Sequence, residues 1–189
     1  MNDLKEFSDE ELVTLYMKGD EKAFEEIYLR YSLKMKRLIY YYLGDSDAAE
    51  DVYHEVFIRV LRHIDNFRIN MVFSSWIYQI AVNCSKNHLK SRKKNEELVD
   101  REKFRIRDSA VSERSPEEQL IDDVHISAFN RAVEDLSEKF RDVFLLRFDQ
   151  KMKYSDIARI LGCSERTAKW RMSRAVEKIS LFLRDEGVV

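Results

Sequence analysis

The chain of 189 residues contains one proline and four glycines, and it has no long apolar run. Such scarce turn residues leave little chemistry for hairpins, whereas plentiful Leu, Glu, Lys, Arg and Ala favour helices, so we predict an all-α fold. Residues 1–6 show no apolar signal-peptide core, and no stretch approaches the length that spans a bilayer. We therefore expect a cytoplasmic protein with no membrane insertion.

The only two cysteines, Cys84 and Cys163, have no second Cys or His at metal-ligand spacing. We expect reduced, partly buried thiols, with neither a metal nor a disulfide. Glu50 and His54 share a helix face one turn apart, but no second carboxylate–histidine pair follows, so a solvated or interface pair is favoured over metal ligands. The chain also lacks a Gly-rich phosphate loop, a nucleophile elbow and a His-Glu-x-x-His motif, so we expect no enzymatic activity and no cofactor.

The most informative segment, residues 154–175, has the pattern of a helix-turn-helix. A first helix can begin near Ser155, whose hydroxyl can cap it, and its apolar stripe must be buried. Gly162 can adopt a positive φ that ends this helix, and Ser164 can cap the next one. The stripe comprises Ile157, Ala158, Ile160 and Leu161.

The second helix of this motif carries a local excess of positive charge. Residues 165–184 hold six Lys/Arg and two acids, although the whole chain has a net charge of −2. Such a face suits phosphate neutralisation, but an amphipathic surface helix can also be rich in Lys and Arg. The predicted inward residues are Ala168, Met172, Ala175, Ile179 and Leu183, and those left available for DNA are Arg166, Lys169, Trp170, Arg171, Ser173, Arg174 and Lys178.

The first half of the chain predicts four helices. A capping box at Ser8 and Glu11 starts a short first helix, and the second is expected to run from Glu21 to Leu43, where Gly44 stops it. The third is expected over 48–64 and the fourth from Phe73 into 94, with a loop over 65–72 between them. Expected buried residues are Leu12, Val13, Leu15 and Tyr16 in the first helix; Phe24, Ile27, Tyr28, Tyr31, Met35, Leu38, Ile39 and Tyr42 in the second; Val52, Val56, Phe57, Val60 and Leu61 in the third; and Trp76, Ile77 and Ile80 in the fourth.

Charges alternate without apolar periodicity after residue 94, which is typical of a flexible linker. We predict two small helical domains, 1–94 and 116–189, joined by a linker over 95–115. Ser115-Pro116-Glu117-Glu118 restarts helical structure, and helices over 116–136 and 137–149 are expected before the helix-turn-helix.

Aromatic and polar residues interleave between Asn66 and Leu89, as in proteins that stack unpaired bases beside a cationic track. Core packing is the alternative interpretation for Phe73 and Trp76, because they stand at core spacing. Steps of three and four residues align the polar candidates on one face. The residues predicted to bind a melted strand are Arg68, Asn70, Phe73, Trp76, Asn83, Lys86 and Lys90.

Four segments resemble bacterial sigma factors of the extracytoplasmic-function family: residues 48–60, 76–83, 136–144 and 154–158. The resemblance covers nearly all of 8–184, with the motifs in the expected order. It implies a region 2 domain that binds the β′ clamp helices of core RNA polymerase and opens the −10 element, and a region 4 domain that reads the −35 element and meets the β flap.

The resemblance also implies residue roles. Asp51, Glu55, Arg59 and Arg62 would face polymerase, Asn83 would lie in the pocket for a flipped −10 base, and Lys169, Arg171 and Arg174 would lie on the −35 helix. Further expectations are an anti-sigma factor as a partner and a monomer when the chain is free of partners. Two departures from the family pattern are Ile69-Asn70-Met71-Val72, where Gly and small polar residues are usual, and Trp170, where a small Ser is usual. Trp170 could pack on a thymine methyl or sugar, or cover the domain.

The competing hypothesis is a helix-turn-helix regulator that binds duplex DNA without acting as a polymerase subunit. Such a regulator would leave the segment 66–94 and its acidic neighbouring helix without a function. Dependence of promoter use on core RNA polymerase distinguishes the two hypotheses.

Overall fold

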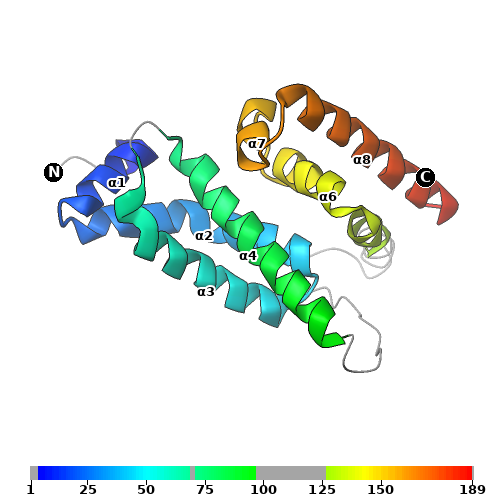
Figure 1. The fold of residues 1–189 in the computed structure, drawn as a ribbon, viewed down its shortest axis with the longest axis horizontal. Helices are drawn as coiled ribbons and strands as arrows, with labels where there is room; N and C mark the ends of the chain where they lie inside the picture. The colour runs from blue at the N-terminus through cyan, green and yellow to red at the C-terminus, as the bar shows by residue number, and fades with distance from the viewer. Residues whose placement is uncertain (1–3, 69–70, 97–126, 189) are drawn as a thin grey trace, which may run out of the picture. The chain divides into compact units, whose positions relative to one another are not determined.

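The computed structural model describes residues 4–68, 71–96 and 127–188, without the side chains of 93–96. Within these ranges the regular elements are helices, and no strand is present. The chain divides into two compact units, Met1–Asp100 and Arg101–Val189 (Figure 1). The predicted linker over 95–115 lies outside the described residues except for Asn95 and Glu96, so its boundaries stay a prediction.

The first unit begins with the short 3-10 helix η1 (Leu4–Glu6) and with α1 (Asp9–Met17). The predicted capping box is present, because the Ser8 hydroxyl accepts from the Glu11 amide and the Glu11 carboxylate accepts from the Ser8 amide. These reciprocal bonds satisfy two donors that a helix start leaves unpaired. α2 (Glu21–Leu43) has the predicted bounds, and Gly44 after it has φ +64.

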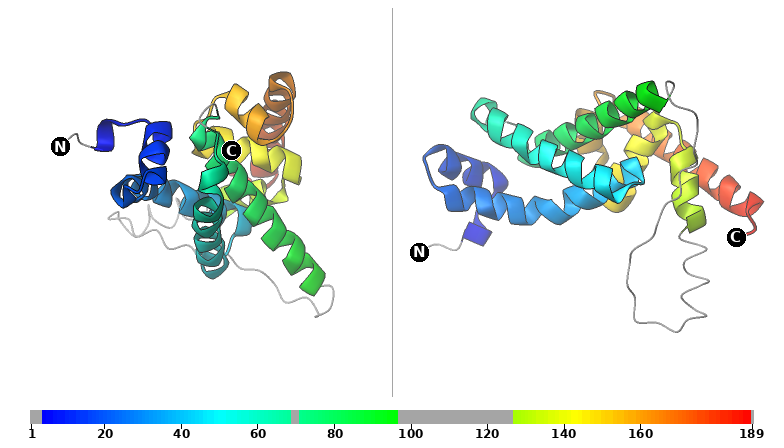
Figure 2. Two further views of the ribbon diagram at one scale, coloured as in Figure 1. Left: turned by 60° about the vertical axis from the view of Figure 1, so that its left-hand side comes forward. Right: turned by 90° about the horizontal axis from the view of Figure 1, so that it is seen from below.

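α3 (Ser46–His63) follows, capped by the Asp45 carboxylate and continued by the 3-10 helix η2 (Ile64–Asn66). α4 (Phe73–Glu96) completes the unit, and α2, α3 and α4 contact one another in pairs (Figures 1 and 2). Their shared core includes the fully buried Ile27, Met35, Val56 and Ile77. Burial of each such side chain stabilises the fold by roughly 1.5–3 kcal/mol.

Two side chains of this unit that were expected to be buried are exposed. Tyr28 is 39% exposed and Leu61 is 41% exposed, because both lie at the edge of the buried stripe of their helix. Five further residues that were expected to be buried are half-buried: Leu15, Tyr16, Phe24, Trp76 and Ile80. The Tyr28 ring nevertheless packs against Phe57, with 4.9 Å between the ring centroids.

The second unit contains helical residues 127–135, α6 (Glu138–Phe144), α7 (Tyr154–Ile160) and α8 (Glu165–Asp185). Residues 116–126 of one predicted helix lie outside the described residues. The helix predicted over 137–149 is present, but its second half is the π-helical turn η3 (Leu145–Asp149). Its buried residues, among them Val143 and Leu146, pack with α8 and α7 into a core of their own.

No helix among the described residues has the length and apolar character needed to cross a membrane.

Candidate nucleic-acid and polymerase interfaces

The turn between α7 and α8 is stabilised by local hydrogen bonds. The Leu161 amide donates to the Ile157 carbonyl at 2.9 Å, and the Cys163 amide donates to the Ala158 carbonyl at 3.0 Å. Gly162 lies between them with φ +60, which a residue bearing a Cβ adopts only with strain. This geometry confirms the predicted helix-turn-helix.

The caps of the two helices differ. Ser164 caps α8 as predicted, because its hydroxyl accepts from the Thr167 amide at 3.0 Å. The predicted cap at Ser155 is wrong, since α7 begins one residue earlier and Lys153 occupies the capping position without a side-chain hydrogen bond. At the start of α7 the Lys153 carbonyl accepts from the Asp156 and Ile157 amides, each at 3.0 Å, and the Ile157 side chain is buried.

Helix α8 presents most of the predicted DNA-binding residues to solvent. Ala168, Ala175 and Ile179 are buried, whereas Met172 and Leu183 are half-buried. With 100° between successive residues, the side opposite Ala168 and Ala175 belongs to Arg166, Lys169, Trp170, Ser173 and Arg174. All five are exposed, as is Lys178. Arg171 is half-buried because it lies nearer the packed side of α8.

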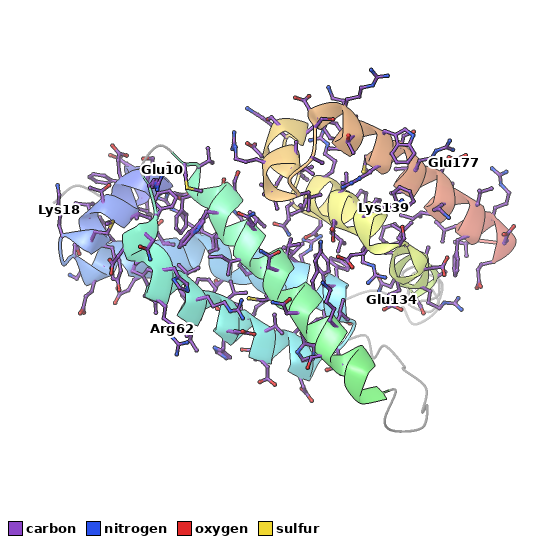
Figure 3. All side chains as sticks on the ribbon, in the orientation of Figure 1. Glu10, Lys18, Arg62, Glu134, Lys139 and Glu177 are labelled. Carbon is purple, nitrogen blue, oxygen red and sulfur yellow. The ribbon has the colours of Figure 1, made fainter. Side chains whose placement is uncertain are left out.

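Two of these cations form exposed ion pairs within the helix. Lys169 Nζ lies 2.7 Å from a Glu165 carboxylate oxygen, and Arg174 Nη1 lies 2.6 Å from one of Glu177; Glu177 is labelled in Figure 3. Exposed pairs at this spacing are worth only about 0.3–0.5 kcal/mol. A phosphate can therefore replace either carboxylate at small cost.

Trp170 uses part of its ring to cover the domain. Its ring lies edge-on to Phe140 of α6, with centroids 5.9 Å apart. Because 51% of Trp170 stays exposed, part of the residue remains available to a ligand. The structure thus shows the covering contact and leaves room for the DNA contact.

Sequence reasoning missed a group of cations before α7. The Arg147 guanidinium lies 5.0 Å from the centre of the Tyr154 ring, and Lys169 Nζ lies 5.8 Å from the same centre. Lys151 and Lys153, in the turn that leads into α7, are both exposed. Two lysines directly before the first helix of the motif were the sequence signal that could have revealed them.

In the first unit, three aromatic rings meet at the beginning of α4. The centroid distances are 5.5 Å from Phe67 to Phe73, 5.7 Å from Phe73 to Trp76 and 5.5 Å from Phe67 to Trp76. Phe73 has no exposed surface, so its predicted contact with a melted strand is wrong and the core interpretation holds for this residue. Trp76 is half-buried and can both pack and bind.

The polar candidates on α4 lie where the helical spacing placed them. Asn83 and Lys90 are exposed and Lys86 is half-buried. Arg68, before α4, is exposed as well. Asn70 lies outside the described residues, so its predicted role is not tested.

Helix α3 carries the predicted charged face. The Arg59 guanidinium and the Glu55 carboxylate form an ion pair at 2.5 Å, with 39% and 45% of their side chains exposed. Asp51 and Arg62 are exposed, and Arg62 is labelled in Figure 3. Ile58 was missed, yet it stands seven residues after Asp51 and four before Arg62, and 46% of it is exposed.

The Glu50–His54 pair lies on the surface of α3, where Lys36 of α2 joins it. His54 Nε2 lies 3.2 Å from Glu50, and Lys36 of α2 reaches the same carboxylate at 2.9 Å. The Lys36 ammonium holds the pKa of Glu50 below its ordinary value. Among the described residues no group of His, Cys, Asp or Glu side chains could hold a metal ion.

Both cysteines are free thiols in the structure. Cys84 is buried in α4, and desolvation raises the pKa of its thiol to about 11. Cys163 is half-buried in the turn of the helix-turn-helix. The Cys84 thiol, with its raised pKa, is a packing residue and a poor nucleophile.

Comparison with known proteins assigns both units to one family. Sigma-70 region 2 matches residues 27–95, and Sigma-70 region 4 matches residues 126–179. The RNA polymerase sigma-H factor of Pseudomonas aeruginosa is 32% identical over 185 residues, which are 95% of this chain and 96% of that protein. The ECF RNA polymerase sigma-E factor of Escherichia coli K12 is 31% identical over 180 residues, which are 93% and 94% of the two chains.

Two solved structures share the fold. The sigma factor RpoE of Bartonella quintana, solved with the anti-sigma factor NepR, has a TM-score of 0.69 at 21% identity and covers 86% of this chain and 98% of its own. CnrH, solved with the cytosolic domain of CnrY, has a TM-score of 0.71 at 18% identity, with coverage of 95% and 99%. The chain therefore belongs to the extracytoplasmic-function sigma factors, non-enzymatic proteins that direct promoter-specific initiation by RNA polymerase.

Proposed function

We propose that the work of promoter recognition is divided between the two units: α8 reads the −35 element, and α4 with the residues before it binds the opened −10 strand. The supporting observation is that each unit has its own exposed cationic surface. A regulator of duplex DNA would need the helix-turn-helix alone. The two surfaces fit a protein that reads one duplex element and one melted element.

At the −35 element, Arg166, Lys169, Ser173 and Arg174 are the candidates for base and phosphate contacts in the major groove. Lys151 and Lys153 stand before α7, where a helix-turn-helix meets the DNA backbone. Arg171 and Lys178 flank the exposed side and are better suited to phosphates than to base edges. Trp170 supports this surface through Phe140.

At the −10 element, Asn83 is the candidate for hydrogen bonds with the edge of an extruded base, because its amide offers both a donor and an acceptor. Trp76 offers a ring for stacking, and Phe73 supports that ring from the core. Lys86, Lys90 and Arg68 provide positive charge along the strand.

For core polymerase, the candidate surface is the α3 face formed by Asp51, Glu55, Ile58, Arg59 and Arg62. An apolar side chain surrounded by charges is the usual composition of an interface, with a desolvated centre and a polar rim. We expect Ile58 to supply the centre and the charges to set complementarity. The β′ clamp helices are the proposed partner of this face, and the β flap is the proposed partner of the second unit.

Two further features of the proposal follow from the family. The related RpoE structure contains the anti-sigma factor NepR, and we propose that an anti-sigma factor also holds this chain inactive. Action with RNA polymerase places the protein in the cytoplasm, as a monomer when it is free of partners. The domain boundaries proposed are 1–94 and 116–189.

The test is run-off transcription from a genomic library with core polymerase alone, with the chain alone and with both. Promoter-specific transcripts should require both, because each small unit offers few DNA contacts and polymerase links them at high effective concentration. A sequence-specific footprint from the chain alone that polymerase leaves unchanged would favour the duplex-binding regulator.

A further inference from the structure

A carboxylate from α1 is bound to the first residue of α4. Glu10 Oε1 accepts a hydrogen bond from the Phe73 amide at 2.8 Å, across 63 residues of sequence. The first amides of a helix have no partner within it, and the preceding Val72 has no side-chain acceptor. Glu10 therefore caps α4 from another helix, with its negative charge at the positive end of the helix dipole. Figure 3 shows Glu10 on α1 beside the beginning of α4.

The position of Glu10 is fixed by a network around Arg30 of α2. The Arg30 guanidinium uses all five of its N–H donors, and the Tyr31 hydroxyl donates to Asp9, the residue before Glu10. These bonds hold the start of α1 on α2. The acceptors of Arg30 are Glu26 Oε1 at 2.8 Å, Phe7 O at 2.8 Å, Asp9 Oδ1 at 2.9 Å, Leu4 O at 3.2 Å and Lys5 O at 3.0 Å.

The same network continues into the surface assigned to the −10 strand. The Tyr31 ring lies edge-on to Phe73, with 5.7 Å between centroids, and Phe73 contacts both Phe67 and Trp76. α1 precedes the region 2 match, which begins at residue 27. A segment outside that match thus determines where the −10 surface begins.

We propose that Glu10 is a positioning residue for promoter opening: its carboxylate fixes the beginning of α4 and thereby holds Trp76 in the arrangement that receives the unpaired −10 strand. Glu10 acts through α4 and not on DNA, because a carboxylate near phosphates would repel them. The inference rests on the proposed −10 function of α4. It adds α1 to the elements that this function requires.

The experiment compares full-length Glu10→Ala and Glu10→Gln with the parent protein in holoenzyme. The Gln side chain keeps an oxygen that can accept from the Phe73 amide, so it should restore most of the function. Glu25→Ala is the matched control, since Glu25 is an exposed glutamate of α2 in the same unit. The measurements are capture by core polymerase, the rate at which −10 thymines become permanganate-reactive, and affinity for a fork template with a single-stranded −10 element.

Glu10→Ala should lower the opening rate and the fork affinity about tenfold, the loss expected when a hydrogen bond to a charged group is removed, while core capture stays parental. Glu10→Gln and Glu25→Ala should lie within about twofold of the parent. A direct readout is amide exchange at Phe73, which should accelerate about tenfold in Glu10→Ala while mid-helix amides of α4 keep parental rates.

Parental opening and parental Phe73 exchange in Glu10→Ala would overturn the proposal. So would a parallel loss of core capture and melting temperature, since Glu10 would then serve only overall stability. If Glu10→Ala fails to fold, Glu10→Gln supplies the test. The proposal is overturned if Glu10→Gln opens promoters tenfold more slowly than the parent while amide exchange at Phe73 is unchanged. A parent holoenzyme that opens no promoter refutes the proposed −10 function instead, so the two failures are distinguishable.

Discussion

Reversing both charges of the Glu55–Arg59 pair should weaken binding to core polymerase without unfolding the protein. In the variant Glu55→Lys/Arg59→Glu the two side chains keep opposite signs at the same helical spacing, so the pair can reform in the reverse order. Because both side chains are about 40% exposed, the pair contributes at most about 0.5 kcal/mol to the free energy of unfolding. For a unit of this size that corresponds to a change in Tm of about 2–4 °C or less.

The effect on binding should be much larger. Charges at an interface set complementarity, and a like-charge contact costs several kcal/mol, so reversal of two neighbours should weaken capture by at least tenfold. The assay is a titration of labelled protein with core polymerase at two salt concentrations, together with thermal unfolding by circular dichroism. The weakening should shrink at high salt, because screening reduces exposed electrostatic interactions.

A matched control is available on the other side of α3. Lys36 and Glu50 form an exposed pair at 2.9 Å between α2 and α3, with 46% and 48% of their side chains exposed. Lys36→Glu/Glu50→Lys changes the same number of charges in the same unit away from the proposed face, and it should bind core polymerase as the parent does. Parental capture by the Glu55/Arg59 variant, or equal losses in both variants, would refute the assignment of the α3 face.

Three further results are expected. Arg174→Ala should weaken use of the −35 element and, where Arg174 contacts a base, relax base preference at one position by roughly 1–3 kcal/mol. Lys178→Ala should weaken binding to all sequences uniformly and reduce the salt slope by about one unit. Footprinting across a salt series separates the two effects, and parental behaviour of both variants contradicts the assignment of α8 to the −35 element. Asn83→Ala should keep the −35 footprint but reduce permanganate-reactive thymines near −10, and a parental opening rate contradicts its role. Cys163 should react with a thiol reagent in the native protein at pH 8. Cys84 should react only after unfolding, because its pKa of about 11 leaves roughly one thiolate in a thousand at that pH. Equally fast reaction of both thiols would contradict the burial of Cys84.

The features that the sequence predicted correctly are encoded over a few neighbouring residues. α2 has its expected bounds because Asp20 caps its first turn and Gly44 takes the left-handed conformation after its last one. The turn at Gly162 and the cap at Ser164 were predictable for the same reason. Helical spacing also placed Asn83 and Lys90 on the surface, since a helix face is a local property.

The features that the sequence could not predict depend on contacts between distant segments. Periodicity marks an apolar stripe but not its edges, so Tyr28 and Leu61 were expected to be buried although packing leaves them partly exposed.

Phe73 is a residue whose burial the local sequence could not settle, because its spacing suits a core residue and its neighbours suit a nucleic-acid surface. Phe73 is buried because Tyr31 and Phe67, from other parts of the chain, pack against its ring. The hydrogen bond from the Phe73 amide to Glu10 joins positions 63 residues apart, and no local sequence pattern predicts it. Local signals therefore identify which residues can bind nucleic acid, whereas non-local packing decides which of them are presented and which hold the others in place.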